Sequence, residues 1–192
     1  MQPRRARSEA RVSARCRAAR CAHPAPDPRR ARSAASSGSV QRVASMRMSA
    51  FIAAPRERVY DALLDPEAVV RWKVPAGMRC EVHEFDASEG GAIRISLTYD
   101  APDRAGKTHG RTDTYHGRFV RLVPNELVVE ADEFETDDPA LRGEMLITIG
   151  LSDVLGGTAL DAVHDGLPEG VSPADNELGW REALARLAAL VE

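Results

Sequence analysis

Residues 172–192, SPADNELGWREALARLAALVE, give the strongest structural signal in the chain. Ser172 is a typical helix N-cap, Pro173 suits the first helical position, and Asp175 places an acid in the first turn. Apolar side chains then recur at helical spacing and form one continuous stripe: Trp180, Leu184, Leu187 and Val191. The pattern predicts an amphipathic helix from Pro173 to Val191, roughly 28 Å long. A helix of this length can cross a whole β-sheet and pack on its apolar face.

The region before this helix predicts strands separated by turns. Ile93, Ile95, Leu97 and Tyr99 alternate with polar side chains, which is typical of a strand with one buried face and one wet face. Further strands are expected over residues 48–53, 78–83, 111–123, 127–134, 144–151 and 158–165. The turns between them are short, so the sheet is expected to be antiparallel. Glycine pairs at 90–91 and 156–157 suit a strongly curved sheet.

Two short helices are predicted after the first strand. Pro55 opens one of them, and Asp65 followed by Pro66 opens the other, which ends near Trp72. The predicted fold class is therefore α+β, with a curved antiparallel sheet of about six or seven strands wrapped around a long C-terminal helix. This domain is expected to span residues 46–192.

Residues 1–45 are predicted to be a disordered tail rich in Arg, Ala, Ser and Pro, because they offer almost no large apolar side chains to bury. Their composition resembles an organellar transit peptide, and it also suits a basic tail for nucleic acid or acidic membrane. We favour a start assigned too early, with translation beginning at Met46 or Met48. None of these interpretations gives the tail a fold.

Charge and cysteine content limit the classes of function that residues 51–192 can have. Residues 51–192 carry 14 basic and 27 acidic side chains, a net of −13, and this acidic body argues against a nucleic-acid surface. No apolar stretch approaches the length of a membrane span, and three cysteines make no disulfide framework, so the cytoplasm is the expected location. The chain has only two lysines, Lys73 and Lys107, against 24 arginines. We interpret that bias as the mark of a GC-rich coding sequence.

Several short motifs resemble the SRPBCC (START-like, helix-grip) superfamily, and within it the bacterial homologues of the C-terminal domain of the activator of heat-shock-protein-90 ATPase. The motifs are IAAPRERVYDAL (52–63), DPE (65–67), RW (71–72), GGAIRI (90–95), Gly117, VPNEL (123–127), GTAL (157–160) and the segment from Gly179-Trp180 to residues 187–190. The resemblance implies a sheet that grips the C-terminal helix and encloses a cavity. Two departures stand out. Lys73 occupies a position where relatives often have a second aromatic residue, and residues 1–45 cannot supply the separate N-terminal domain of the chaperone activator.

Strand alternation and helix spacing select the side chains expected to face this cavity. Leu160, Ala162 and His164 share one parity on the last predicted strand, so His164 is expected to point inward. The predicted ligand-binding residues are Trp72, Ile95, Leu97, Tyr99, Tyr115, Phe119, Phe134, His164, Asn176 and Trp180. Apolar and aromatic walls with a few polar groups are typical of small-molecule sites. His83, His109 and His116 are expected to be solvated.

No nucleophile elbow, paired-carboxylate motif, phosphate-binding loop or metal-spaced cluster stands out, so no catalytic residue, metal or cofactor is predicted. The favoured function is non-catalytic binding of a hydrophobic or aromatic small molecule in the cavity. One alternative is a cyclase- or hydrolase-like enzyme with His164 as acid–base, which a wide cavity holding a polar pair would favour. Another is a chaperone-associated interaction domain, which a filled cavity and an acidic patch would favour. The sequence leaves a homodimer open.

Overall fold

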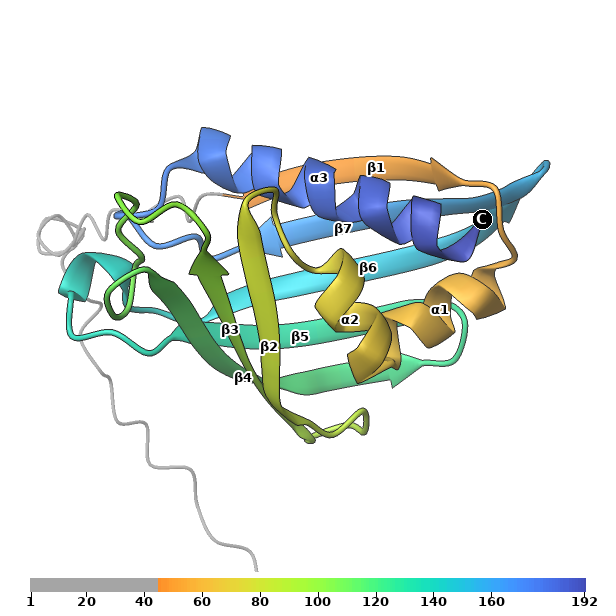
Figure 1. Cartoon of the computed structure of the whole chain (residues 1–192). Helices are drawn as coiled ribbons and strands as arrows, with labels where there is room; N and C mark the ends of the chain where they lie inside the picture. Colours follow the sequence, from red (N-terminus) through yellow and green to blue (C-terminus); the bar gives the residue numbers. More distant parts are fainter. Residues whose placement is uncertain (1–44) are drawn as a thin grey trace, which may run out of the picture. The chain divides into compact units, whose positions relative to one another are not determined.

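The computed structural model describes residues 45–192, which form one curved sheet with helices on its inner face (Figure 1). The prediction for residues 1–45 lies outside the described residues, except that Ser45 already belongs to the first strand. The elements in chain order are β1 (Ser45–Ile52), α1 (Arg56–Leu64), α2 (Pro66–Trp72), β2 (Met78–Phe85), β3 (Ala92–Tyr99), β4 (Thr112–Val123), β5 (Leu127–Phe134), a 3-10 turn η1 (Pro139–Leu141), β6 (Met145–Val154), β7 (Gly157–Asp165) and α3 (Pro173–Val191).

The strands pair antiparallel in the order β1-β7-β6-β5-β4-β3-β2, which confirms the predicted fold class. Strands β1 and β2 follow each other in the chain but form opposite edges of the sheet, so α1 and α2 connect one edge to the other (Figure 1). Strand β1 begins three residues earlier than predicted. Its first residue, Ser45, pairs with Asp165 of β7, a backbone pairing that no side-chain pattern marks.

Two irregularities in strand pairing accompany the curvature. The register shifts between Val82 and Glu84 in β2, and between Phe119 and Arg121 in β4. Such bulges bend a strand and increase its local twist. Gly90, in the turn between β2 and β3, has a φ of 84°, a left-handed conformation that favours glycine.

Helix α3 has the bounds that the sequence predicts, and its cap explains where it begins. The Ser172 side chain accepts a hydrogen bond from the backbone N–H of Asp175, over 3.3 Å. In its C-terminal half, Leu184, Leu187 and Val191 are 4%, 0% and 3% exposed, where the helix contacts α1, α2 and β1. This half closes one end of the inner face with a dry apolar core.

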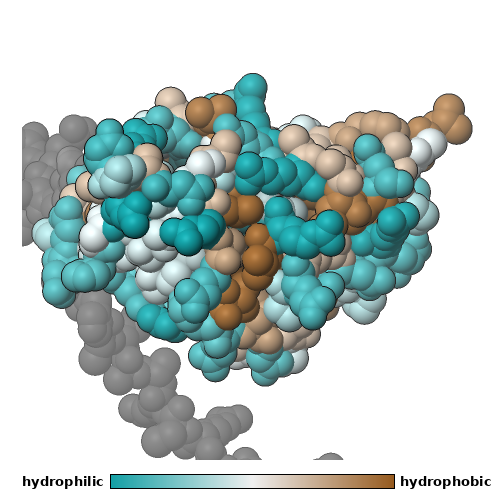
Figure 2. Space-filling model, in the orientation of Figure 1, coloured by the Kyte–Doolittle hydropathy of each residue, from teal (hydrophilic) through white to brown (hydrophobic). Residues whose placement is uncertain are grey.

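The surface of the domain is mostly hydrophilic on the face that Figure 2 shows, with apolar side chains in a narrow strip near its centre and at the tip of the β6–β7 hairpin. At that tip Val154 is 42% exposed and Leu155 is fully exposed. Within residues 45–192, no helix has both the length and the apolar character needed to cross a bilayer.

Candidate functional site

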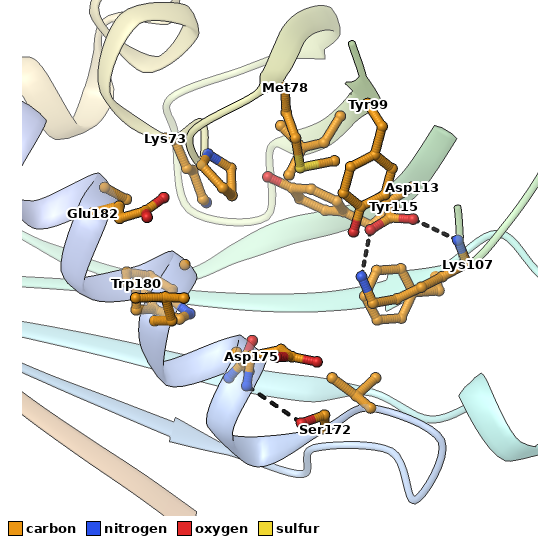
Figure 3. Close-up of a pocket in the computed structure, with 18 of the residues that line it drawn as sticks. Lys73, Met78, Tyr99, Lys107, Asp113, Tyr115, Ser172, Asp175, Trp180 and Glu182 are labelled. Atoms are coloured by element: carbon orange, nitrogen blue, oxygen red, sulfur yellow. Dashed lines mark hydrogen bonds and ion pairs between the residues drawn. The ribbon is translucent and has the colours of Figure 1, made fainter. Parts of the chain in front are cut away.

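A cavity of about 690 Å³ lies between the sheet and the N-terminal half of α3 (Figure 3). Helix α3 forms one wall, the inner faces of β2 to β7 form another, and residues 103–107 and 170–172 close its end. Its lining includes these apolar and aromatic side chains: Met78, Leu97, Tyr99, Tyr115, Phe134, Met145, Val171, Leu178 and Trp180. The two halves of α3 therefore cover different things, a packed core and an open volume.

Seven of the ten predicted ligand-binding residues line this cavity: Leu97, Tyr99, Tyr115, Phe134, His164, Asn176 and Trp180. The other three, Trp72, Ile95 and Phe119, are at most 1% exposed and belong to the core. The Trp72 indole donates to the carbonyl of Ala62 over 2.9 Å, and Phe119 meets Phe85 edge to face at 5.3 Å. Alternation gives the correct face of the sheet, but it does not tell how far along the strand the cavity reaches.

A buried ion pair lies at the base of the cavity. The Lys73 ammonium, at the C-terminal end of α2, donates to Glu130 Oε2 on β5, and both side chains are at most one-tenth exposed. The same ammonium lies 5.7 Å from the centroid of the Tyr115 ring. Burial alone would lower the pKa of Lys73, but the nearby carboxylates of Glu130 and Asp132 outweigh it and raise that pKa. Lys73 is therefore a firmly protonated cation and a poor nucleophile.

A second carboxylate stands beside this pair without a cation of its own. Asp132 is 2% exposed, lines the cavity, and its Oδ1 has no hydrogen-bond partner within residues 45–192. Burial raises the pKa of Asp132 to about 7; Lys73 opposes that rise and Glu130 adds to it. The space for this carboxyl exists because the cross-strand partner is a glycine: a Cβ on Gly117 would lie 2.1 Å from Asp132 Oδ1.

His164 adds a fourth buried polar group, from β7. Its Nδ1 lies 3.1 Å from the amide nitrogen of Asn176 on α3, and its ring meets Trp180 edge to face at 6.1 Å. An amide nitrogen can only donate, so Nδ1 accepts and the neutral ring carries its proton on Nε2. Burial, together with the charge of Lys73, lowers the pKa of His164 to about 4. The buried Nε2 has no partner among the described residues. We call Lys73, Glu130, Asp132 and His164 the buried polar cluster.

A further ion pair borders the other end of the cavity. Asp113, 3% exposed, accepts from both the backbone N–H and the ammonium of Lys107 (Figure 3). The Lys107 ammonium lies 5.7 Å from the centroid of the Phe134 ring, and the Arg104 guanidinium lies 5.5 Å from that of Tyr99. Both ring faces are thus already in contact with cations of the chain.

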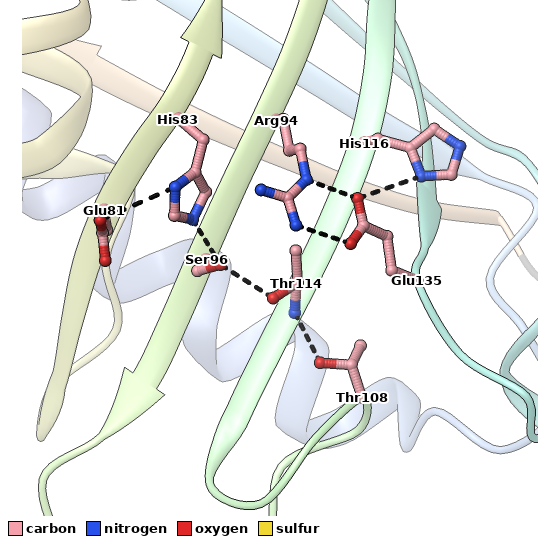
Figure 4. A network of polar contacts seen from close by, with 8 residues as sticks. All are labelled: Glu81, His83, Arg94, Ser96, Thr108, Thr114, His116 and Glu135. Atoms are coloured by element: carbon pink, nitrogen blue, oxygen red, sulfur yellow. Dashed lines mark hydrogen bonds and ion pairs between the residues drawn. The ribbon is translucent and has the colours of Figure 1, made fainter.

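The outer face of the sheet carries a separate set of polar contacts (Figure 4). His83 and Thr114 each lie 2.8 Å from the Ser96 hydroxyl, while Arg94 donates twice to Glu135, at 2.7 and 2.9 Å. These side chains have the opposite strand parity to Ile95 and Tyr115, so they do not reach the cavity. His83 and His116 have the outward parity that the sequence predicts.

Sequence reasoning missed the charged groups of the site. The sequence marks Lys73 only as a departure from the family, and it does not mark Glu130 and Asp132, which lie two residues apart on one face of β5. The rarity of lysine is the signal that the sequence offers. The chain has two lysines, and the structure places both of them at the cavity. Within residues 45–192, no three metal-ligating side chains converge as a metal site requires.

Comparison with known proteins places this chain in a family. The model of the activator of Hsp90 ATPase homolog 1-like proteins matches residues 53–192. The chain belongs to this family. The match confirms the resemblance seen in the sequence motifs.

Solved structures of similar proteins agree in fold. A protein from Chromobacterium violaceum is 38% identical, with a TM-score of 0.69 over 77% of this chain and 96% of its own. A protein from Rhodobacter sphaeroides is 24% identical, with a TM-score of 0.63 over 76% of this chain and 90% of its own. An AHSA1-like protein from Aeromonas hydrophila is 18% identical, with a TM-score of 0.58 over 77% and 92%. The search of curated proteins found no match.

Proposed function

We propose that this protein binds a small, mainly apolar or aromatic molecule in the cavity between the sheet and the N-terminal half of α3. The cavity itself carries the proposal. Its volume of about 690 Å³ lies within the range of small-molecule sites and far exceeds the voids that a close-packed interior leaves. Aromatic side chains from β3, β4, β5 and α3 surround it, as suits a ligand with a flat apolar body.

Native mass spectrometry of the purified full chain is the first test, because a ligand retained in the cavity adds its mass to the protein. The second is titration with N-phenyl-α-naphthylamine, an uncharged probe that becomes fluorescent in apolar surroundings. We expect saturable binding of one probe per chain. Absence of both a retained mass and saturable probe binding would contradict the proposal.

A matched pair of variants ties the binding to the cavity. Ala183 lines the cavity, whereas Ala185, two residues further along α3, is exposed to solvent. Ala183→Phe is expected to fill part of the volume and weaken probe binding by about tenfold or more. Ala185→Phe places the same ring on the solvent side and should leave the affinity unchanged. Equal effects would mean that the probe binds elsewhere.

Acid–base catalysis in the same cavity is a second candidate, and Asp132 favours it. The enzyme alternative predicts a wide cavity that holds a polar pair, and buried polar groups line this cavity. A general acid or base works best when its pKa is near the working pH, which applies to Asp132 and not to the His164 that the sequence suggested. Hydrolysis of p-nitrophenyl acetate that is lost in Asp132→Asn but kept in Glu133→Gln would support this candidate. No turnover above the buffer rate would count against a hydrolase.

A further inference from the structure

Carboxyl groups outnumber cations in the lining of the cavity. The charged side chains that line it are Lys73, Arg104, Lys107, Asp103, Asp113, Asp132, Asp175 and Glu182. Each of the two lysines is neutralised by a carboxylate, Glu130 or Asp113, and the exposed Arg104 is matched in number by its neighbour Asp103. Three lining carboxyl groups remain after this pairing. The cavity is therefore electronegative, and complementarity favours a positive ligand over a negative one.

Two of the three remaining carboxyl groups lie on α3. Asp175 and Glu182 are seven residues apart, which is about two helical turns, and both lie on the cavity side of the helix (Figure 3). Within residues 45–192, neither has a cation at ion-pair distance. Arg186, one turn beyond Glu182, donates to the Val74 carbonyl instead. The negative charge of this wall is thus left uncompensated by the described part of the chain.

The Glu182 carboxylate is half-buried and offers an accessible oxygen. Its Oε2 accepts from the backbone N–H of Ala76 over 2.7 Å, whereas Oε1 has no hydrogen-bond partner among the described residues. The side-chain atoms there that are both enclosed and unpaired are Arg56 Nε, Asp132 Oδ1 and His164 Nε2, so Glu182 Oε1 is not sealed off. A ligand ammonium can donate to this oxygen without breaking a bond of the chain, in a charge-assisted hydrogen bond.

Trp180 is a second feature of the same wall that points to a ligand. It lines the cavity and is 9% exposed, and its indole N–H has no partner in residues 45–192 and is not enclosed, so this donor opens on the cavity. Chain cations lie over the rings of Tyr115, Phe134 and Tyr99, but none lies over Trp180 within the described residues. Tryptophan binds cations best of the aromatic side chains, and this ring is available to one.

We infer that the ligand of this cavity is an organic cation, an aromatic or alicyclic amine whose apolar body lies among the aromatic walls and whose ammonium group donates to Glu182. This inference rests on the proposed binding function and specifies its ligand class. Asp175 adds a second negative charge on the same side of α3. Asp132 contributes its charge to the field in the cavity but makes no contact in this assignment.

Three naphthalene compounds of nearly equal shape test the inference by competition with N-phenyl-α-naphthylamine at about pH 7.5. β-Naphthylmethylamine is a cation at this pH, β-naphthylmethanol is uncharged, and β-naphthoate is an anion. On the full-length protein we expect the amine to bind at least about fivefold more tightly than the alcohol, and the anion to bind most weakly. An alcohol that binds as tightly as the amine, or an anion that binds most tightly, would overturn the inference and leave the proposed function intact.

Two glutamates of α3 provide matched variants. Glu182 lines the cavity, whereas Glu177 pairs with Arg181 at the surface and does not line it. Glu182→Gln removes the charge but keeps an acceptor for the Ala76 N–H, and it should reduce the preference for the amine over the alcohol to about twofold or less. Glu177→Gln removes the same charge elsewhere on the helix and should keep the wild-type preference. An unchanged preference in Glu182→Gln, or equal losses in both variants, would overturn the inference. Failure of every probe, N-phenyl-α-naphthylamine included, would remove the proposed function as well.

Discussion

The two halves of α3 pack on the same face of the same sheet, but one half buries an apolar core and the other covers a cavity. The C-terminal half brings Leu184, Leu187 and Val191 against α1, α2 and β1 and leaves no room for a ligand. The N-terminal half covers a cavity whose wall holds the buried polar cluster. Burial of apolar side chains at one end stabilises the domain, and that surplus allows the other end to keep unpaired polar groups that lower its stability.

Lys73→Met should produce the largest loss of stability, because it leaves the buried carboxylates of Glu130 and Asp132 with no cation. Breaking a buried pair from one side typically costs about 3–5 kcal/mol. Urea denaturation at about pH 8 measures the effect, and adding Glu130→Gln should restore much of it. Arg181→Met is the control, since its ion pair with Glu177 is exposed and worth less than about 1 kcal/mol. If both substitutions cost the same, Lys73 is not buried as described.

The second largest loss of stability is expected from a substitution in the C-terminal, packed half of α3. Leu187 is 0% exposed, so Leu187→Ala should cost about 2–5 kcal/mol in unfolding free energy. Leu178, on the cavity half of the same helix, is 57% exposed, and Leu178→Ala should stay within about 0.5 kcal/mol. Thermal and urea unfolding of the two variants compare the halves directly. Similar losses at both positions would contradict the division of α3 into a packed half and a covering half.

Substitution of Asp132 is expected to change the unfolding free energy by a smaller amount, and this change depends on pH. The pKa of Asp132 in the folded protein is about 7, above the ordinary value of 3.8. The stabilisation linked to its protonation is therefore fully present below pH 3.8 and is lost as the pH rises through 7. Relative to wild type, Asp132→Asn should therefore gain roughly 2–3 kcal/mol of stability between about pH 5 and pH 8. His164 works in the opposite direction, because its pKa falls from 6.5 to about 4, but its effect cancels when variant and wild type are compared at each pH. A stability difference that does not change with pH would show that Asp132 stays ionised throughout.

The fold could be read from the sequence because its signals are local. The cap at Ser172 and the stripe from Trp180 to Val191 fix both ends of α3, and alternation in β3 and β7 gives the inward faces correctly. The start of β1 depends instead on backbone pairing with β7, more than 100 residues away, and no local pattern marks it.

The site was predictable only for its aromatic and aliphatic walls. Trp72, Ile95 and Phe119 satisfy the same periodicity as true wall residues, and only the position of α3 separates the two groups. The buried polar cluster was beyond local reasoning, because Lys73 and Glu130 are 57 residues apart and meet only in the folded sheet. The scarcity of lysine is interpreted in the sequence as a coding bias, and that interpretation gives no reason to look at the two lysines that are present. The two exceptions to it, Lys73 and Lys107, mark the cavity.

The two tryptophans allow the most direct test of the central claim, that one half of α3 covers an accessible cavity while the other end is dry. Trp180 lines the cavity, and Trp72 is 1% exposed in the core with its indole bound to Ala62. A ¹⁵N-labelled chain should show one indole N–H signal from each, assigned by Trp180→Phe and Trp72→Phe. On titration with N-phenyl-α-naphthylamine we expect the Trp180 signal to shift saturably at one molecule per chain, while the Trp72 signal stays in place. Two unmoved signals, or two signals that shift together, would contradict the account.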